Sequence, residues 1–152
     1  MWRIFGICFY GDKNHFLIER EKRFSQDLIV PFLREKRIAM SDTAAEVVRT
    51  KNTASDKDLE IVEQTDLDAL LRALPLCEAV ITAGQLATSV FCCHFQISEP
   101  RVGGFSELTF EGREVRLYRM PSSSRAYPMT VERKAQAYRK VFGWLGMVGH
   151  ER

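Results

Sequence analysis

A polar stretch in the last third of the chain carries side chains suited to binding an anion. Residues 119–128 read RMPSSSRAYP, and five successive residues in it are a proline, three serines and an arginine: Pro121, Ser122, Ser123, Ser124 and Arg125. Small hydroxyl residues let a phosphate approach the backbone closely and can donate hydrogen bonds to it, and the arginine adds positive charge. The stretch predicts a loop that holds a phosphate-bearing partner. The alternative is a polar connection that caps the last helix.

The charges along the chain favour the same region. The formal net charge is only +2, but residues 113–140 carry eight bases against two acids, whereas residues 41–78 carry nine acids against four bases. Basic charge gathered around one loop fits a nucleic-acid partner. The alternative is an ordinary solvated helix face.

A second group of reactive side chains, Cys92, Cys93 and His94, does not predict a metal site. Successive residues of one helix point about 100° apart, so these three cannot easily share one ion. The four cysteines form no C-x-x-C pair, which indicates reduced thiols. His15 and His150 have no visible acid-base partner, and the chain has no G-x-S-x-G elbow. We therefore expect no metal site.

Several segments must position the loop. Residues 25–36 predict a helix capped by Ser25, in which Pro31 must lie near the first turn or kink the helix. Ile38 to Met40 predict a short buried strand. Residues 52–62 predict a polar loop that leads to a helix or a short strand. Thr65 then opens a helix with leucines on one face.

The second half of the chain alternates more clearly. Residues 77–84 predict a strand that ends in Gly84, and a helix follows from Gln85. Alternating residues on both sides of Glu111-Gly112 predict a β-hairpin whose second arm ends at Pro121, because proline cannot donate to a strand ladder. A long amphipathic helix begins after Thr130, which can cap it.

This order of helices and strands predicts an α/β fold, a three-layer α/β/α arrangement with a mainly parallel sheet. In such sheets, ligands bind at the carboxyl ends of the strands. Three loops are expected to leave those ends, near Ser41–Asp42, Gly84–Gln85 and Pro121–Ser122.

The segment LYRMPSSSRAYPMTVERKAQAYRKVF resembles the last motif of the uracil-DNA glycosylase superfamily. The closest branches are the mismatch-specific thymine/uracil and the deoxyinosine/hypoxanthine glycosylases, in which a strand ends in a Pro-Ser loop and a helix containing AYR follows. AVITAGQLATSVF resembles the preceding strand, glycine turn and helix. MWRIFG resembles the aromatic helix that follows the family's first motif. RIAMSDTAAEVVRTKNTASDKDLEIV resembles the segment between that helix and the strand before the glycine turn, where family members have an apolar strand followed by a Ser/Asp loop. The resemblance covers most of the chain, in order.

The resemblance implies a DNA glycosylase that hydrolyses the N-glycosidic bond of a deaminated base, uracil or hypoxanthine, without a cofactor. The flipped base leaves the duplex before the bond is broken. The resemblance implies that the Pro-Ser loop contacts the DNA backbone and that Gly84 and Gln85 place helix N-terminal amides near a phosphate. It also implies that a second set of residues could border the base pocket: Ser41, Asp42, Ser55 and Asp56. The alternative is that these four residues cap loops and helices. Family members place a bulky apolar side chain, which is pressed into the base stack, near the position of Ser124 or Arg125, and this chain has no such side chain there. Gln85 stands where some relatives have a lysine beside the glycine.

The resemblance also implies a strand and a Gly-x-x-Pro-Gly-type loop before the aromatic helix, and residues 1–152 contain neither. We therefore expect a sheet without its first, central strand, an unknown set of catalytic residues and doubtful activity. Relatives act as monomers, but a dimer could cover the resulting apolar gap. The alternative function is a non-catalytic protein of the same fold that binds nucleic acid or another partner.

Length and composition set the remaining expectations. A chain of 152 residues, 45% of them hydrophobic, predicts one domain over residues 1–152. No apolar run approaches the roughly 20 residues needed to cross a bilayer. The start MWRIFGICFYGDK is a poor signal peptide, so the expected location is the cytoplasm and no membrane is expected as a partner.

Overall fold

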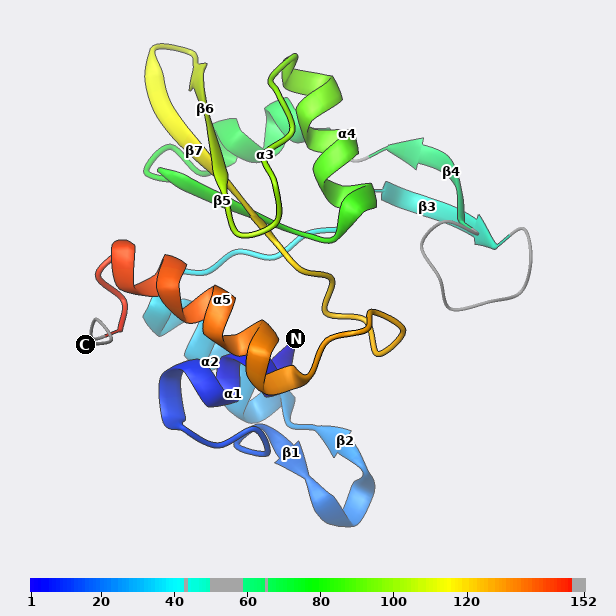
Figure 1. Cartoon of the computed structure of the whole chain (residues 1–152), viewed down its shortest axis with the longest axis vertical. Helices are drawn as coiled ribbons and strands as arrows, with labels where there is room; N and C mark the ends of the chain where they lie inside the picture. The colour runs from blue at the N-terminus through cyan, green and yellow to red at the C-terminus, as the bar shows by residue number, and fades with distance from the viewer. Residues whose placement is uncertain (43, 50–58, 65, 149–152) are drawn as a thin grey trace. The chain divides into compact units, whose positions relative to one another are not determined.

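Helices and short sheets alternate along the chain in the computed structural model (Figure 1). The structure describes four stretches of chain: residues 1–42, 44–49, 59–64 and 66–148. Its contacts divide the chain into two compact units. One contains Met1–Met40 and Pro128–Arg152, and the other contains Ser41–Tyr127. The expectation of a single domain over residues 1–152 stays a prediction.

The first unit is mainly helical. Its elements are α1 (Trp2–Tyr10), β1 (Leu17–Ile18), the short 3-10 helix η1 (Glu19–Glu21), β2 (Arg23–Phe24), α2 (Gln26–Lys36) and α5 (Val131–Trp144). The two expected caps are confirmed. The Ser25 hydroxyl accepts from the Leu28 amide at the start of α2, over 3.3 Å. The Thr130 hydroxyl accepts from the Arg133 amide at the start of α5, over 3.2 Å.

Aromatic rings hold the helices of the first unit together. The Phe5 ring of α1 lies 5.9 Å from that of Phe32 in α2 and 5.8 Å from that of Phe142 in α5. Phe9 contacts the same two rings at 5.1 and 4.9 Å. Edge-to-face and tilted ring pairs at these distances stabilise a core beyond the area that they bury. The aromatic helix implied for the start of the chain is therefore present, and residues 2–10 form no strand.

Gly6 is required in α1 because the chain turns back against it. A Cβ atom at Gly6 would lie 2.3 Å from the Asp12 carbonyl oxygen. The Asp12 amide in turn donates to the Gly6 carbonyl over 3.2 Å. Gly11 ends the helix in a left-handed conformation, with φ 66°.

Pro31 lies inside α2 rather than in its first turn. Proline has no N–H, so the Asp27 carbonyl receives no intrahelical bond from Pro31. Pro31 is exposed, and water can reach the helix there.

The predicted strand at Ile38 to Met40 is wrong. These residues have no regular structure, and Met40 is 49% exposed. A strand requires a neighbouring segment to pair with, and none of the described segments pairs with residues 38–40. The Ile38 amide instead donates to the Leu33 carbonyl over 2.9 Å, in the closing turn of α2.

The second unit combines sheets with two helices. Its elements are β3 (Ala44–Arg49), β4 (Leu59–Gln64), α3 (Leu67–Ala73), β5 (Ala79–Ala83), α4 (Gln85–Phe95), β6 (Phe105–Phe110) and β7 (Arg113–Met120). β3 and β4 pair antiparallel as a separate two-stranded sheet. Of the two alternatives left open after the polar loop of residues 52–62, a helix or a short strand, the structure has the strand β4, whereas β3 was not expected. Asp66 caps α3 by accepting from the Ala69 amide over 3.0 Å, and Thr65 lies outside the described residues.

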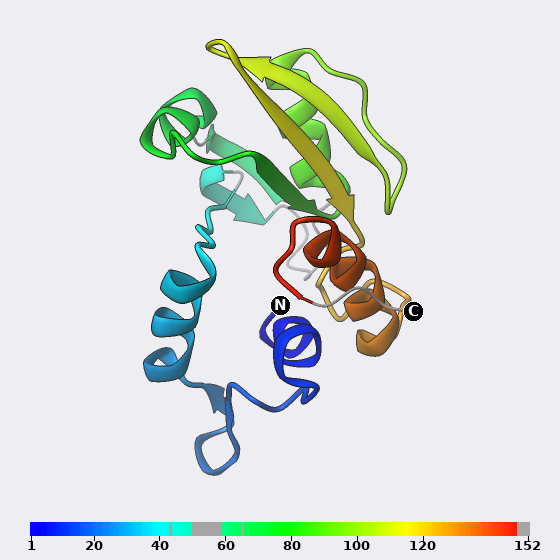
Figure 2. The ribbon, with the colours of Figure 1, turned by 90° about the vertical axis from the view of Figure 1, so that its left-hand side faces the viewer.

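The larger sheet has the order β5-β7-β6, with β7 in the middle (Figure 2). β5 pairs parallel with β7, whereas β6 pairs antiparallel with it. The sheet is therefore mixed rather than mainly parallel, and the chain belongs to the α/β class. The antiparallel pair follows from the predicted hairpin turn, in which Glu111 and Gly112 both have positive φ, 47° and 82°.

One face of this sheet packs against α3 and α4. The shared core consists of Leu67, Leu71, Phe91, Cys92, Leu108, Phe110, Val115 and Leu117. On the opposite face of β7, Tyr118 and Met120 are also buried, at 3% and 1% exposed. Glu114 and Arg116 on that face are exposed, so β7 is buried on both faces only toward its end. Among the described residues, no helix is long and apolar enough to cross a membrane.

Candidate nucleic-acid interface

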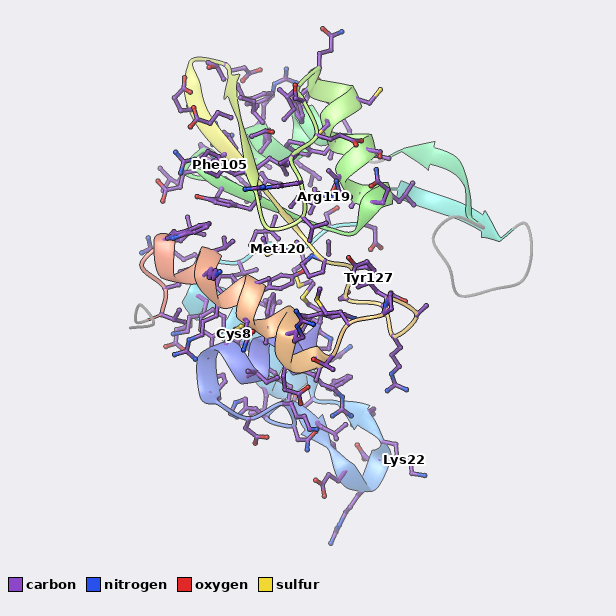
Figure 3. The ribbon with its side chains drawn as sticks, viewed as in Figure 1. Cys8, Lys22, Phe105, Arg119, Met120 and Tyr127 are labelled. Atoms are coloured by element: carbon purple, nitrogen blue, oxygen red, sulfur yellow. The ribbon has the colours of Figure 1, made fainter. Side chains whose placement is uncertain are left out.

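Two strand-end loops meet at one end of the larger sheet. β5 and β7 run parallel, with Ala83 paired to Met120, so both strands end at the same edge. The Gly84 amide donates to the Met120 carbonyl over 3.1 Å. Figure 3 labels Arg119 and Met120 at this end of β7. The two loops that the sequence predicted after β5 and β7 therefore lie side by side.

Gly84 allows the two loops to approach. Its backbone has φ 94° and ψ 173°, a conformation that residues other than glycine rarely adopt. A Cβ atom at Gly84 would lie 3.3 Å from the Ser122 Cβ. Glycine is needed here both for the turn and for the space, and Ser122 lies directly beside the start of α4.

Two buried threonines hold this turn in place. The Thr88 hydroxyl donates to the Gly84 carbonyl over 2.8 Å. The Thr82 and Thr88 hydroxyl oxygens lie 2.9 Å apart, and both residues are buried. Sequence reasoning missed this pair. The spacing of Thr88 four residues after Gly84 is a signal that could have found it, because a threonine can bond the i−4 carbonyl of a helix.

The first turn of α4 presents uncapped amides. Gly84 is the N-cap residue and offers no side chain to accept from them. Unsatisfied N–H groups and the helix dipole together favour an anion at this position. The predicted contribution of Gly84 and Gln85 thus has the required local geometry, and Gln85 is exposed.

Arg119 is a further basic residue at this end, which sequence reasoning did not single out. Its guanidinium donates to the Pro100 carbonyl over 3.0 Å and to the Gln85 side-chain oxygen over 2.5 Å. Its Nε is buried and has no acceptor among the described residues. The Gln85 amide nitrogen also lies 3.4 Å from a Glu99 carboxylate oxygen. One acid and one base therefore flank the start of α4, and Gln85 bridges them.

The serine loop is folded by its own hydroxyl groups. The Ser122 oxygen accepts from the Ser124 amide, and the Ser124 oxygen accepts from the Ala126 amide, each over 3.2 Å. Such turns fix the backbone while the hydroxyl protons remain donors. Within the described chain, Ser123 and Arg125 have no hydrogen-bond or charged partner, and Arg125 is exposed. Pro121 is buried at the end of β7.

The third predicted loop, at Ser41 and Asp42, is not connected to the other two loops by any hydrogen bond among the described residues. Ser41 and Asp42 are exposed, and the Ser41 hydroxyl donates to the Asp42 carbonyl over 3.2 Å. No hydrogen bond of the described residues connects them to Gly84 or Ser122. The other two pocket candidates, Ser55 and Asp56, lie outside the described residues.

The cysteine-histidine segment lies on α4, and its side chains have different surroundings. Cys92 is buried, whereas Cys93 is exposed. Burial raises the pKa of the Cys92 thiol, and the nearby Glu99 carboxylate adds to the effect, so Cys92 stays protonated at neutral pH. The His94 Nε2 atom lies 3.1 Å from an Asp68 carboxylate oxygen. Across the four described stretches, no three His, Cys, Asp or Glu side chains are grouped as metal ligands.

A shallow pocket lies at the other end of β7. Its volume is about 390 Å³, and it is lined by Leu71, Arg72, Pro75, Phe110, Glu111 and Arg113. Its two guanidinium groups are already engaged. Arg72 pairs with Glu111 over 2.6 Å, and Arg113 donates to backbone carbonyls at the end of α3. The pocket therefore offers no unsatisfied charge to a ligand.

The geometry thus assembles one polar end of the sheet from Gly84, Gln85, Arg119 and the serine loop. The arrangement can bind a phosphate through backbone amides, hydroxyl donors and a guanidinium. It brings together two of the three predicted loops. Comparison with protein-family models, with curated proteins and with solved structures finds no match to this chain.

Proposed function

We propose that the chain is a DNA-binding protein of the uracil-DNA glycosylase type, which hydrolyses the N-glycosidic bond of a deaminated base. One observation carries the proposal. The Gly84 turn and the serine loop are joined at the carboxyl ends of two parallel strands, where α/β proteins place their ligands.

The residues at this junction have complementary tasks in the proposal. The first-turn amides of α4 receive one backbone phosphate, since that turn has no side-chain cap. Ser123 and Arg125 contact a second phosphate, because both are without partners in the described chain. Two phosphate contacts at a fixed distance from each other would hold the DNA strand in place beside a flipped base.

The fold proposed for this function is the three-layer arrangement with its central strand missing. Two observations support it. The end of β7 is buried on both faces, by the α3–α4 core on one side and at Tyr118 and Met120 on the other, and a strand between two helical layers is buried in this way. β5 lies at the border of the sheet, where no described segment pairs with its outer side.

A second candidate is a non-catalytic protein of the same fold that binds nucleic acid. One observation favours it. Among the described residues joined at the junction, the one carboxylate, that of Glu99, contacts Gln85 instead of standing free to orient a water. Hydrolysis requires such a positioned water as well as stabilisation of the developing charge.

The catalytic proposal is tested by base release. Duplexes that carry a single uracil or hypoxanthine are incubated with this chain, and abasic sites are measured by alkaline strand cleavage. A second form includes whatever the reading frame encodes before Met1. We expect one of the two forms to release one of the two bases. Intact lesions with both forms would reject the enzymatic function.

The binding proposal is tested separately by titration of an undamaged duplex at several salt concentrations. Affinity is expected to fall steeply with salt, by a slope of about 0.9 per neutralised phosphate. Ser123→Ala combined with Arg125→Ala should weaken binding, whereas the matched change Thr109→Ala on the exposed side of β6 should not. Salt-dependent binding without base release supports the second candidate. Absence of binding rejects both.

A further inference from the structure

The inner side of β5 is fully paired with β7. The Glu78 carbonyl, just before β5, accepts from a β7 amide over 3.0 Å, and the Gly84 amide, just after it, donates to a β7 carbonyl over 3.1 Å. Hydrogen bonds in a parallel pair involve alternate residues of each strand. The residues of β5 in phase with these two bonds, Val80 and Thr82, therefore direct their backbone groups toward β7.

The other three residues of β5 direct their backbone groups outward. They are Ala79, Ile81 and Ala83. Among the described residues, one weak hydrogen bond reaches this side, from the Cys77 thiol to the Ala79 carbonyl over 3.3 Å. A row of unpaired amides and carbonyls is a template for another strand. β5 is a border strand of the sheet, as Figure 2 shows.

The two borders of the sheet differ in how they are protected. β6, at the far border, carries the exposed Glu107 and Thr109, and Glu107 pairs with Arg116 of β7 over 3.1 Å. β5 reads AVITA and has no charge, no proline and no register shift. Charges, prolines and bulges are the usual means by which proteins keep an edge strand from pairing. The border at β5 has none of them.

The side chains of β5 have nearly the same shapes when the strand is read in either direction. In an antiparallel pair centred on Ile81, Ala79 of one copy faces Ala83 of a second copy. Val80 faces Thr82, whose β-branched side chain has the same shape. The residues with outward backbone groups also face one another, Ala79 opposite Ala83 and Ile81 opposite Ile81. Each such pair of an antiparallel ladder exchanges two hydrogen bonds. The strand is therefore complementary to itself.

We infer that β5 pairs with β5 of a second copy, antiparallel, across a two-fold axis at Ile81. The two three-stranded sheets then form one continuous sheet. The contact is isologous, as a two-fold axis requires, and it satisfies the outward backbone groups of both copies. Self-complementarity selects a second copy over an unrelated strand as the occupant. The inference does not depend on the proposed DNA function.

The first test measures molar mass in solution by light scattering over a series of protein concentrations. We expect the mass of two chains, with dissociation on dilution. Ile81→Lys places a charge at the centre of the contact, so this variant should have the mass of one chain. Thr109→Lys makes the matched change at the β6 border and should keep the mass of two. Circular dichroism establishes that each variant is folded.

The second test measures amide hydrogen exchange of each β5 residue in the unmodified chain. The outward amides of Ala79, Ile81 and Ala83 should exchange slowly at high protein concentration and rapidly on dilution. The inward amides of Val80 and Thr82 should stay protected throughout. A single chain at every concentration, a dimeric Ile81→Lys variant, or a dimer whose outward amides exchange rapidly would each overturn the inference. This test remains decisive if Ile81→Lys does not fold.

Discussion

The two ends of β7 both carry arginines, but they use them differently. At its start, the Arg113 guanidinium donates to the carbonyls of Leu71, Leu74 and Cys77 and lies 5.6 Å from the Phe110 ring. Beyond its end, Arg125 has no partner in the described chain. The first end thus uses its positive charge to complete the fold. The second end engages Arg119 with Pro100 and Gln85 but leaves Arg125 available. A basic segment in a sequence becomes a binding surface only where the fold leaves its charges unpaired.

The largest expected effect is at the start of β7. Arg113→Met removes the donors for the last carbonyls of α3 while it keeps much of the side-chain volume. We expect the free energy of unfolding to fall by about 3 kcal/mol, the upper end for bonds from a charged donor. Urea denaturation measures it. Arg116→Met, which removes an exposed guanidinium from the same strand, is the control and should unfold close to the unmodified chain. Equal stability of the two variants would show that the Arg113 hydrogen bonds to the end of α3 do not stabilise the fold.

Gly84→Ala disturbs the opposite end. Its backbone conformation is costly for alanine, and the new Cβ would press on Ser122. We expect a loss of about 2 kcal/mol in unfolding free energy, together with weaker DNA binding. Gly112→Ala in the hairpin turn is the matched control, because Gly112 also has positive φ but a Cβ there meets no atom within 4 Å. If both variants bound DNA equally, the junction of the loops would not be the binding surface.

Thr88→Val tests whether the buried hydroxyl pair holds the Gly84 turn. The change keeps the shape but removes the bond to the Gly84 carbonyl. The expected loss of unfolding free energy is about 1 kcal/mol, typical of one buried hydrogen bond. Thr88→Ser restores the hydroxyl and should recover DNA affinity, measured by titration at fixed salt. Recovery of stability without recovery of affinity would separate the threonine pair from binding.

The smallest effect on stability is expected at Arg125. Arg125→Ala should change the free energy of unfolding by less than about 0.5 kcal/mol, as is usual for an exposed side chain. It should also lower the salt slope of DNA binding by about 0.9, the contribution of one phosphate contact. Arg72→Ala makes the same change in net charge but removes a guanidinium already paired with Glu111. A slope that falls equally in both variants would mean that net charge alone determines binding.

Features encoded in a few neighbouring residues were predicted correctly. The caps at Ser25 and Thr130 follow from a hydroxyl residue ahead of an amphipathic run, and the hairpin follows from Glu111-Gly112. The adjacency of the Gly84 and Ser122 loops also followed, because parallel strands end at one edge. In each case the structure depends on residues close together in the sequence or on the pairing of parallel strands.

Features that depend on a distant partner were not predictable. Ile38 to Met40 have the composition of a strand but no described neighbour to pair with. Arg113 reads as one base among eight, yet its partners lie about forty positions earlier in the chain. Arg119 likewise gains its role from Pro100 and Gln85. Composition records the charge, whereas only the packing of α3, α4 and β7 determines what it contacts.

The tight turn at Glu111 and Gly112 has a consequence for the order of folding. β6 and β7 adjoin this turn, and hairpins of this kind form within about 1–10 µs. Pairing of β5 with β7 must instead close a long stretch of chain that includes α4, so it is expected later. The polar end of the sheet would then be the last part to form. In pulsed hydrogen exchange during refolding, the Gly84 amide should gain protection after those of β6 and β7.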